Sequence, residues 1–223
     1  MRDTAPTDPA TPLGPRPRAT PTRPHHQRGL TVAEADTASR LWTLHLARAA
    51  VAAVAGVVIT FSPDHGPAFG FAVFAGFAIL SGAVALVIGL RTLAGRGRTL
   101  ALASAGVTLA AAVLALVALP VAALLPFIAL IAGWALVSGS LEFSSGRRGT
   151  GLSARDAVIV GLGTALLGAV FALLPPHPVV SVGLLGAYAV MLAVFLAIAA
   201  FSLKWAAGAD AAAPSTPTTG GDR

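Results

Sequence analysis

The sequence contains no cysteine, which excludes disulfide bonds, thiol nucleophiles and thiolate metal sites. Charge is also scarce: 11% of the 223 residues are charged, whereas 56% are hydrophobic and the mean hydropathy is +0.80. Soluble domains carry about 25% charged residues. A chain with so few charges cannot cover a water-soluble surface, so the composition predicts an integral membrane protein.

The chain also lacks the residue patterns of catalytic and metal-binding sites. Its five histidines show no H-x3-H or H-E-x2-H spacing, and no glycine-rich phosphate loop follows a strand. Serine and threonine in the apolar stretches have no evident partner base, and hydroxyls there normally bond to their own helix backbone or to a neighbouring helix. We therefore expect no enzyme activity, no cofactor and no metal ion.

Six apolar stretches are present instead. A helix needs about 20 mostly apolar residues to cross the hydrocarbon core of a bilayer, and most of the stretches come close to this length. We therefore expect an all-α integral membrane protein with six transmembrane helices, in contact with the lipid bilayer. The expected spans cover residues 44–62, 67–90, 99–119, 121–143, 156–174 and 179–203.

Lysine and arginine occur on one side of these spans. Nearly all fifteen precede the first span, follow the sixth, or lie in the second and fourth connections, with Arg48 just inside the first span. Because basic residues near helix ends stay on the cytoplasmic face, this pattern predicts a multi-pass plasma-membrane protein with both termini cytoplasmic. The orientation of the protein in the membrane already explains the basic residues that give the net charge of +6, so nucleic acid is not an expected partner. The Ala, Gly, Arg and Pro bias suggests a bacterial source.

Both ends of the chain differ from the membrane domain expected at residues 41–206. Residues 1–40 contain seven prolines by position 24, which predicts a disordered cytoplasmic tail. Residues 207–223 predict a second, shorter flexible tail. The Pro-Arg run at 15–18 fits either a ligand for an aromatic groove of a partner or a solvated tail beside anionic headgroups.

Short proline-containing connections join the spans on the predicted outer face. They are Ser62 to Pro67, Pro120 alone, and Pro175 to Pro178. Such tight turns make each pair of helices antiparallel. We expect three helical hairpins, at residues 44–90, 99–143 and 156–203.

The hairpins are related by an internal repeat. A shift of 57 residues superposes small residues, the turn proline and the terminal arginine of the first hairpin on those of the second. Both copies therefore keep one orientation, as parallel repeats do. Small residues four positions apart form grooves for close helix contact. The predicted packing residues are Ala72, Gly76, Ala78, Gly82, Ala129, Gly133, Ala135 and Gly139.

Few ionisable groups occur inside the spans. Glu142, at the cytoplasmic end of the fourth span, is expected to pair with Arg147 or Arg148, or with the basic end of another hairpin. Arg48 is expected to extend along its helix to the headgroups, with a buried functional arginine as the alternative. A separate group of titratable residues, on the outer face, forms the candidate pH-responsive set, because histidine gains charge on mild acidification. This set is Asp64, His65 and His177.

The segment from Gly133 to Glu142, GWALVSGSLE, resembles the signature of the HdeD-like membrane proteins. The third hairpin resembles it through Gly186-Ala187-Tyr188 and the closing Ser202-Leu203-Lys204, and the likeness covers residues 44–206. The resemblance implies a two-helix repeat in three copies, in an inner-membrane protein associated with acid resistance. Leu192 departs from the pattern, because a small residue is expected there.

Three functions follow from these observations. The leading hypothesis is a non-enzymatic HdeD-like protein that contributes to acid or envelope stress tolerance through helix packing, with a second copy or another membrane protein as a partner. A small transporter or channel would need a polar path, for which the spans offer Ser81, Ser138, Tyr188 and Glu142. A scaffold that recruits a cytoplasmic partner through its Pro/Arg tail is the third.

Overall fold

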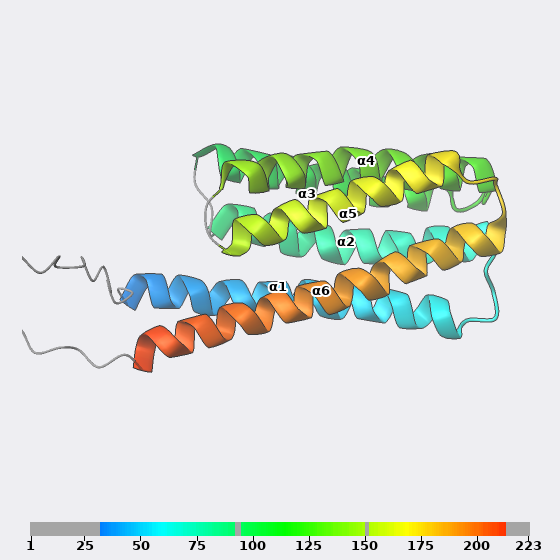
Figure 1. Cartoon of the computed structure of the whole chain (residues 1–223). Helices are drawn as coiled ribbons and strands as arrows, with labels where there is room; N and C mark the ends of the chain where they lie inside the picture. The colour runs from blue at the N-terminus through cyan, green and yellow to red at the C-terminus, as the bar shows by residue number, and fades with distance from the viewer. Residues whose placement is uncertain (1–31, 92–94, 150–151, 213–223) are drawn as a thin grey trace, which may run out of the picture.

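The computed structural model describes residues 32–91, 95–149 and 152–212, and this part of the chain is helical without strands (Figure 1). Six helices are long and apolar enough to cross a membrane, which confirms the predicted number and class. They are α1 (Val32–Phe61), α2 (Pro67–Arg91), α3 (Gly95–Ala118), α4 (Leu124–Arg148), α5 (Leu152–Leu173) and α6 (Pro178–Ala212).

Proline sets several of these boundaries. Pro67 and Pro178 are the first residues of α2 and α6, where a missing N–H costs nothing. The expectation that Pro120 alone links the third and fourth helices is wrong. The link covers residues 119–123, because the chain turns through Ala122, whose φ is +41°, before α4 begins. The amides of Val121 and Ala122 both donate to the carbonyl of Ala118 and close this turn.

The first and last helices are longer than expected. Helix α1 begins at Val32, inside the predicted tail 1–40, and α6 continues to Ala212, inside the predicted tail 207–223. The prolines that oppose helix formation end at Pro24, and residues 32–40 contain none. The remaining parts of both predicted tails, 1–31 and 213–223, lie outside the described residues.

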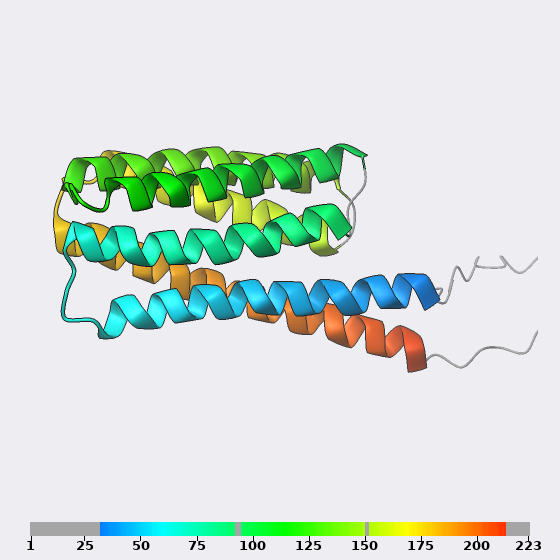
Figure 2. The same ribbon diagram turned by 180° about the vertical axis from the view of Figure 1, so that it is seen from behind.

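The helices form a ring in chain order, with neighbours antiparallel (Figures 1 and 2). Contact is most extensive between α4 and α5, between α1 and α6, and between α2 and α3. It is smaller between α3 and α4 and between α1 and α2, and slight between α5 and α6. The tightest pairs therefore differ from the expected hairpins. We call the end where α1 begins and α6 ends the termini end, and the end with the loops 62–66, 119–123 and 174–177 the turn end.

Glycine determines which helices approach most closely. A β-carbon at Gly139 would lie 2.5 Å from the backbone nitrogen of Ala165 in α5, and one at Gly82 would lie 2.8 Å from Leu109 in α3. Ala78 and Ala135 are also buried. Helix α6 approaches α1 through Gly186, where a β-carbon would lie 2.6 Å from Ile59. These contacts explain why α2·α3, α4·α5 and α1·α6 are the tight pairs.

The other half of the predicted packing set faces outward. Nothing lies within 4 Å of a β-carbon built on Gly76 or Gly133, and Ala72 and Ala129 are exposed. The expectation that these four line helix contacts within the chain is wrong. The two small-residue pairs of each helix are offset by six positions, which is about 240° around a helix. One helix therefore cannot turn both pairs toward the same neighbour.

The half of the bundle near the turn end is filled with aromatic and branched side chains. Phe71, Phe74 and Phe127 are fully buried, and the rings of Phe71 and Phe127 meet edge to face at 5.3 Å. Phe171 adds a further edge contact to Phe127 at 6.3 Å. Large apolar side chains also cover the outer surface of every helix, as expected for contact with lipid. The space left for polar groups lies nearer the termini end.

Candidate functional site

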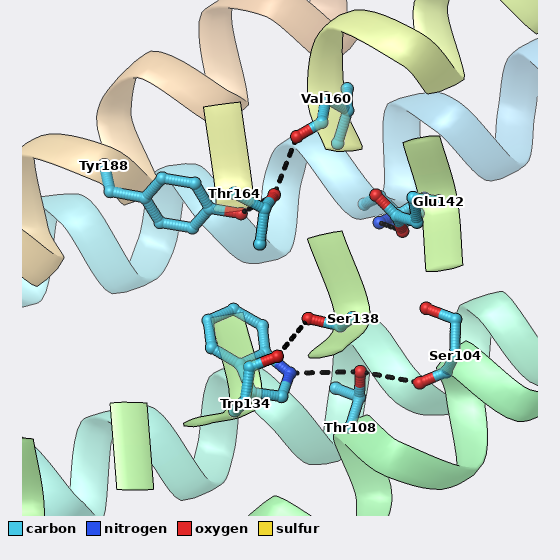
Figure 3. Close-up of polar contacts among 9 residues, drawn as sticks. Ser104, Thr108, Trp134, Ser138, Glu142, Val160, Thr164 and Tyr188 are labelled. Atoms are coloured by element: carbon cyan, nitrogen blue, oxygen red, sulfur yellow. Dashed lines mark hydrogen bonds and ion pairs between the residues drawn. The ribbon is translucent and has the colours of Figure 1, made fainter. Parts of the chain in front are cut away.

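Polar side chains from all six helices surround one cavity, which we call the polar cavity; Figure 3 shows those that α3, α4, α5 and α6 contribute. Its water-accessible volume is about 20 Å³, enough for about one water molecule. Polar groups are costly inside a membrane domain, so their convergence is the main candidate for function. The lining residues are Arg48 of α1, Phe77, Ser81 and Ala85 of α2, Ser104 and Thr108 of α3, Trp134, Ser138 and Glu142 of α4, Thr164 of α5, and Tyr188 and Leu192 of α6.

An ion pair crosses the cavity between two helices that are not packed against each other. Nη2 of Arg48 in α1 lies 3.0 Å from Oε1 of Glu142 in α4. The side chains keep 18% and 20% of their surface exposed. Arg48 lies six residues, about 9 Å, after the start of the apolar span of α1 at Trp42, and Glu142 lies the same distance before the end of α4 at Arg148. The pair therefore lies within the apolar spans of both helices.

The expectation that Arg48 extends to the headgroups is wrong, because its guanidinium turns inward to Glu142. Of the two alternatives for Glu142, a basic partner from another hairpin is the one observed, namely Arg48 of α1. Arg147 and Arg148 follow Glu142 by five and six positions, whereas ion pairs within a helix need a spacing of three or four. The guanidinium of Arg147 lies over the ring of Phe143, 5.7 Å from its centroid.

Two threonine–aromatic hydrogen bonds line the middle of the cavity. Nε1 of Trp134 donates to Oγ1 of Thr108 over 3.2 Å, and Oγ1 of Thr164 lies 2.8 Å from the hydroxyl of Tyr188. Each threonine also donates its own proton to the carbonyl four residues earlier, Ser104 O or Val160 O. A hydroxyl has one proton. Tyr188 is therefore the donor to Thr164, just as Trp134 is the donor to Thr108 (Figure 3).

Not every hydroxyl in the cavity is used. Ser138 donates to the carbonyl of Trp134 over 2.6 Å. Ser81 and Ser104, which are 7% and 6% exposed as whole residues, line the cavity, and neither hydroxyl forms a hydrogen bond with another described residue. These two groups are therefore available to a water molecule or a ligand.

Aromatic rings close the cavity on the side of the turn end. The ring of Trp134 lies 6.0 Å from Phe77 and 6.3 Å from Tyr188, with edge-to-face geometry in both pairs. The ring of Phe74 also packs against Trp134, with 5.0 Å between the centroids. Between these rings and the turn end, the bundle is filled by the aromatic core of Phe71, Phe127 and Phe171. The polar cavity is thus bounded by rings on one side and by the Arg48–Glu142 pair on the other.

The candidate pH-responsive residues lie far from this cavity, at the turn end. Asp64 and His65 belong to the loop between α1 and α2, and His177 immediately precedes α6. The carboxylate of Asp64 accepts the amide of Gly66 over 2.7 Å and stabilises the turn. His177 is exposed and its carbonyl accepts the amide of Ser181. In the part of the chain that the structure describes, no three His, Cys, Asp or Glu residues gather as metal ligands would.

The structure brings together the four residues that the sequence suggested for a polar path. Ser81, Ser138, Tyr188 and Glu142 all line the polar cavity. Sequence reasoning gave a buried functional Arg48 as an alternative and missed four other polar lining residues, although two regularities could have indicated them. Thr108 and Thr164 lie 56 positions apart, close to the repeat length, and Ser104 lies one helical turn before Thr108. The missed residues are Ser104, Thr108, Trp134 and Thr164.

No protein-family model matches the chain, and neither curated proteins nor solved structures give a match. The HdeD-like resemblance therefore stays a prediction from the sequence.

Proposed function

We propose that this protein is a non-enzymatic membrane transporter that admits a small polar solute to the polar cavity between its helices. One observation carries the proposal: side chains from all six helices converge on a cavity that contains an ion pair and unpartnered hydroxyls. Helix association in lipid needs small residues and close packing, which the glycine contacts already supply. The buried charges are not needed for that purpose, and such charges mark solute or ion pathways.

The state described by the structure is closed to the turn end. Aromatic rings at Trp134, Phe77 and Tyr188 fill that side of the cavity. On the other side the Arg48–Glu142 pair keeps about a fifth of each side chain exposed. A solute therefore enters from the termini end, and release at the turn end requires the aromatic layers to move apart. Alternating exposure of one site to two sides is the general mechanism of secondary transporters.

The termini end is assigned to the cytoplasm. Basic residues of the described chain flank that end of the helices, and the positive-inside rule retains such residues on the cytoplasmic side. The membrane is then the plasma membrane of a bacterium, in keeping with the composition. The flanking residues are Arg91, Arg96, Arg98, Arg147, Arg148, Arg155 and Lys204.

A role in acid tolerance is the second candidate, favoured by the HdeD-like segment from Gly133 to Glu142. Deletion of the gene should lower survival after an acid challenge and leave growth at neutral pH unchanged. If the turn end senses acid, the triple variant Asp64→Asn, His65→Gln, His177→Gln should reproduce the deletion at normal abundance. Full protection by that variant would remove the sensing role.

Solute entry into liposomes tests the transport function. Purified protein is reconstituted, and entry of glycerol, glycine, potassium chloride and protons is followed by light scattering and an internal pH dye. Ser138→Leu fills the cavity, whereas Ser140→Leu makes the same change on an exposed position of the same helix. We expect at least one solute to enter faster than in empty vesicles, with Ser138→Leu slow and Ser140→Leu unchanged. Equal rates in all four vesicle types would refute the transport function.

A further inference from the structure

The polar cavity has spare hydrogen-bond donors around Arg48. Arg48 makes one contact to Glu142 through Nη2, which leaves four of its five N–H groups. The hydroxyls of Ser81 and Ser104 add two donors without a partner among the described residues. The N–H of Trp134 and the O–H of Tyr188 are already used. A cavity with spare donors around a guanidinium suits a ligand that accepts hydrogen bonds, such as an anion.

Charge balance decides how an anion can bind. Arg48 and Glu142 together are neutral, and an unbalanced charge inside a membrane span is costly. An anion alone would leave the site at −1, and a proton alone would leave it at +1. One anion and one proton bound together keep the site neutral. The carboxylate is the natural acceptor for the proton, since its neutral form no longer competes with the anion for Arg48.

We propose that the polar cavity binds a small monovalent anion together with one proton, the anion at Arg48 and the proton on Glu142. The inference rests on the proposed transport function and names its substrate class. In the bound state the proton from solvent forms an O–H bond on Glu142, and the guanidinium transfers from the carboxylate to the anion. The cavity holds about one water as it stands, so the anion is small, and it occupies space released when the ion pair opens.

Few other ionisable groups face Glu142. Of the residues that line the cavity, Arg48 of α1 and Tyr188 of α6 are the ionisable ones besides Glu142 itself, while α2, α3 and α5 contribute hydroxyl and apolar groups. His45 lies one helical turn before Arg48 on α1 and outside the cavity lining. A variant His45→Gln therefore serves as a control for the origin of any pH dependence.

Trp134 provides a reporter inside the cavity. Replacement of the other two tryptophans, Trp42→Phe and Trp205→Phe, leaves one fluorophore, and iodide is both a small monovalent anion and a quencher. Iodide titrations of the detergent-purified full chain at pH 5 and pH 8 measure binding, with chloride as a non-quenching competitor. Because one proton binds with each anion, the apparent affinity should fall by up to about tenfold for each pH unit once that proton must be taken from solvent.

Variants test the role of Arg48 in anion binding separately from the role of Glu142 in proton binding. Glu142→Gln, a neutral isostere, should bind iodide about equally at both pH values, whereas Arg48→Gln should lose saturable quenching and Arg48→Lys should retain part of it. Arg147→Gln and His45→Gln should behave like the unaltered chain. Saturable quenching that survives Arg48→Gln, or a pH dependence that survives Glu142→Gln, would overturn the inference. So would the absence of chloride-sensitive quenching in the unaltered chain.

The iodide-binding experiment and the liposome experiment can fail separately. Vesicles that pass glycerol or glycine while iodide fails to bind would refute the anion site and leave the transport function standing. Chloride-sensitive, proton-linked iodide binding in a protein that passes no solute would support the site and refute transport.

Discussion

Nη2 of Arg48 lies 3.0 Å from Oε1 of Glu142, although the residues are 94 positions apart and their helices, α1 and α4, are not a packed pair. Near the turn end, aromatic contacts such as Phe71 with Phe127 join helices that are not neighbours in the ring. At the polar cavity, the ion pair supplies a direct link between α1 and α4. It also places two opposite charges where a hydrophobic contact would have closed the ring more cheaply, which is why we assign the pair to function.

The glycines of α4 give a matched test of the packing. Gly139→Ala should lower the free energy of unfolding by about 1–3 kcal/mol, because the new β-carbon would meet the backbone of Ala165. Gly133→Ala, on an open face of the same helix, should leave stability unchanged or raise it by up to about 1 kcal/mol through helix propensity. Thermal unfolding in detergent measures both. A larger loss at Gly133 than at Gly139 would contradict the packing.

The threonine–aromatic bonds should contribute modestly and separably. Removing the hydroxyl in Tyr188→Phe should cost about 0.5–1.5 kcal/mol, and a double-mutant cycle with Thr164→Val should give a coupling of about 0.6 kcal/mol, as is usual between membrane helices. Thermal unfolding of the two single variants and the double variant provides the cycle. Strictly additive losses would show that the two side chains act separately and would contradict the bond.

The absence of cysteine makes the orientation directly measurable. Pro176→Cys at the turn end should react with an impermeant maleimide in intact cells, while Gly97→Cys at the termini end should react after the cells are lysed. The reason is the concentration of arginine at the termini end. The unaltered chain, which has no thiol, is the blank. Labelling of Gly97→Cys but not of Pro176→Cys in intact cells would reverse the assignment.

Much of the fold could be predicted from the sequence because span length and charge position are local properties. The six spans, and the prolines that begin α2 and α6, needed no knowledge of neighbouring helices. The contact partners could not be obtained in this way. Ala72 and Gly76 have the same spacing as Ala78 and Gly82, and the choice between the two faces depends on which side of α2 meets α3.

The polar cavity was partly predictable for the same reason. Ser81, Ser138 and Glu142 stood out as polar residues in apolar spans, but nothing local showed that they share one space. Arg48 lies near the start of its span, where an arginine ordinarily reaches the headgroups. Its inward direction depends on the carboxylate of Glu142, which belongs to a helix far along the chain.

A charge exchange tests the central claim, that Arg48 and Glu142 face each other across the polar cavity, most directly. Arg48→Glu and Glu142→Arg each place two like charges together and should lower the free energy of unfolding by about 2–4 kcal/mol, somewhat less than for a fully buried pair because each side chain is about one-fifth exposed. Thermal unfolding in detergent provides the measurement. The double variant Arg48→Glu, Glu142→Arg should regain most of that loss, whereas the exchange Glu142→Arg, Arg147→Glu should not. The account would be contradicted if the double variant Arg48→Glu, Glu142→Arg were no more stable than the less stable of its two single variants. It would also be contradicted if the exchange Glu142→Arg, Arg147→Glu regained the lost stability.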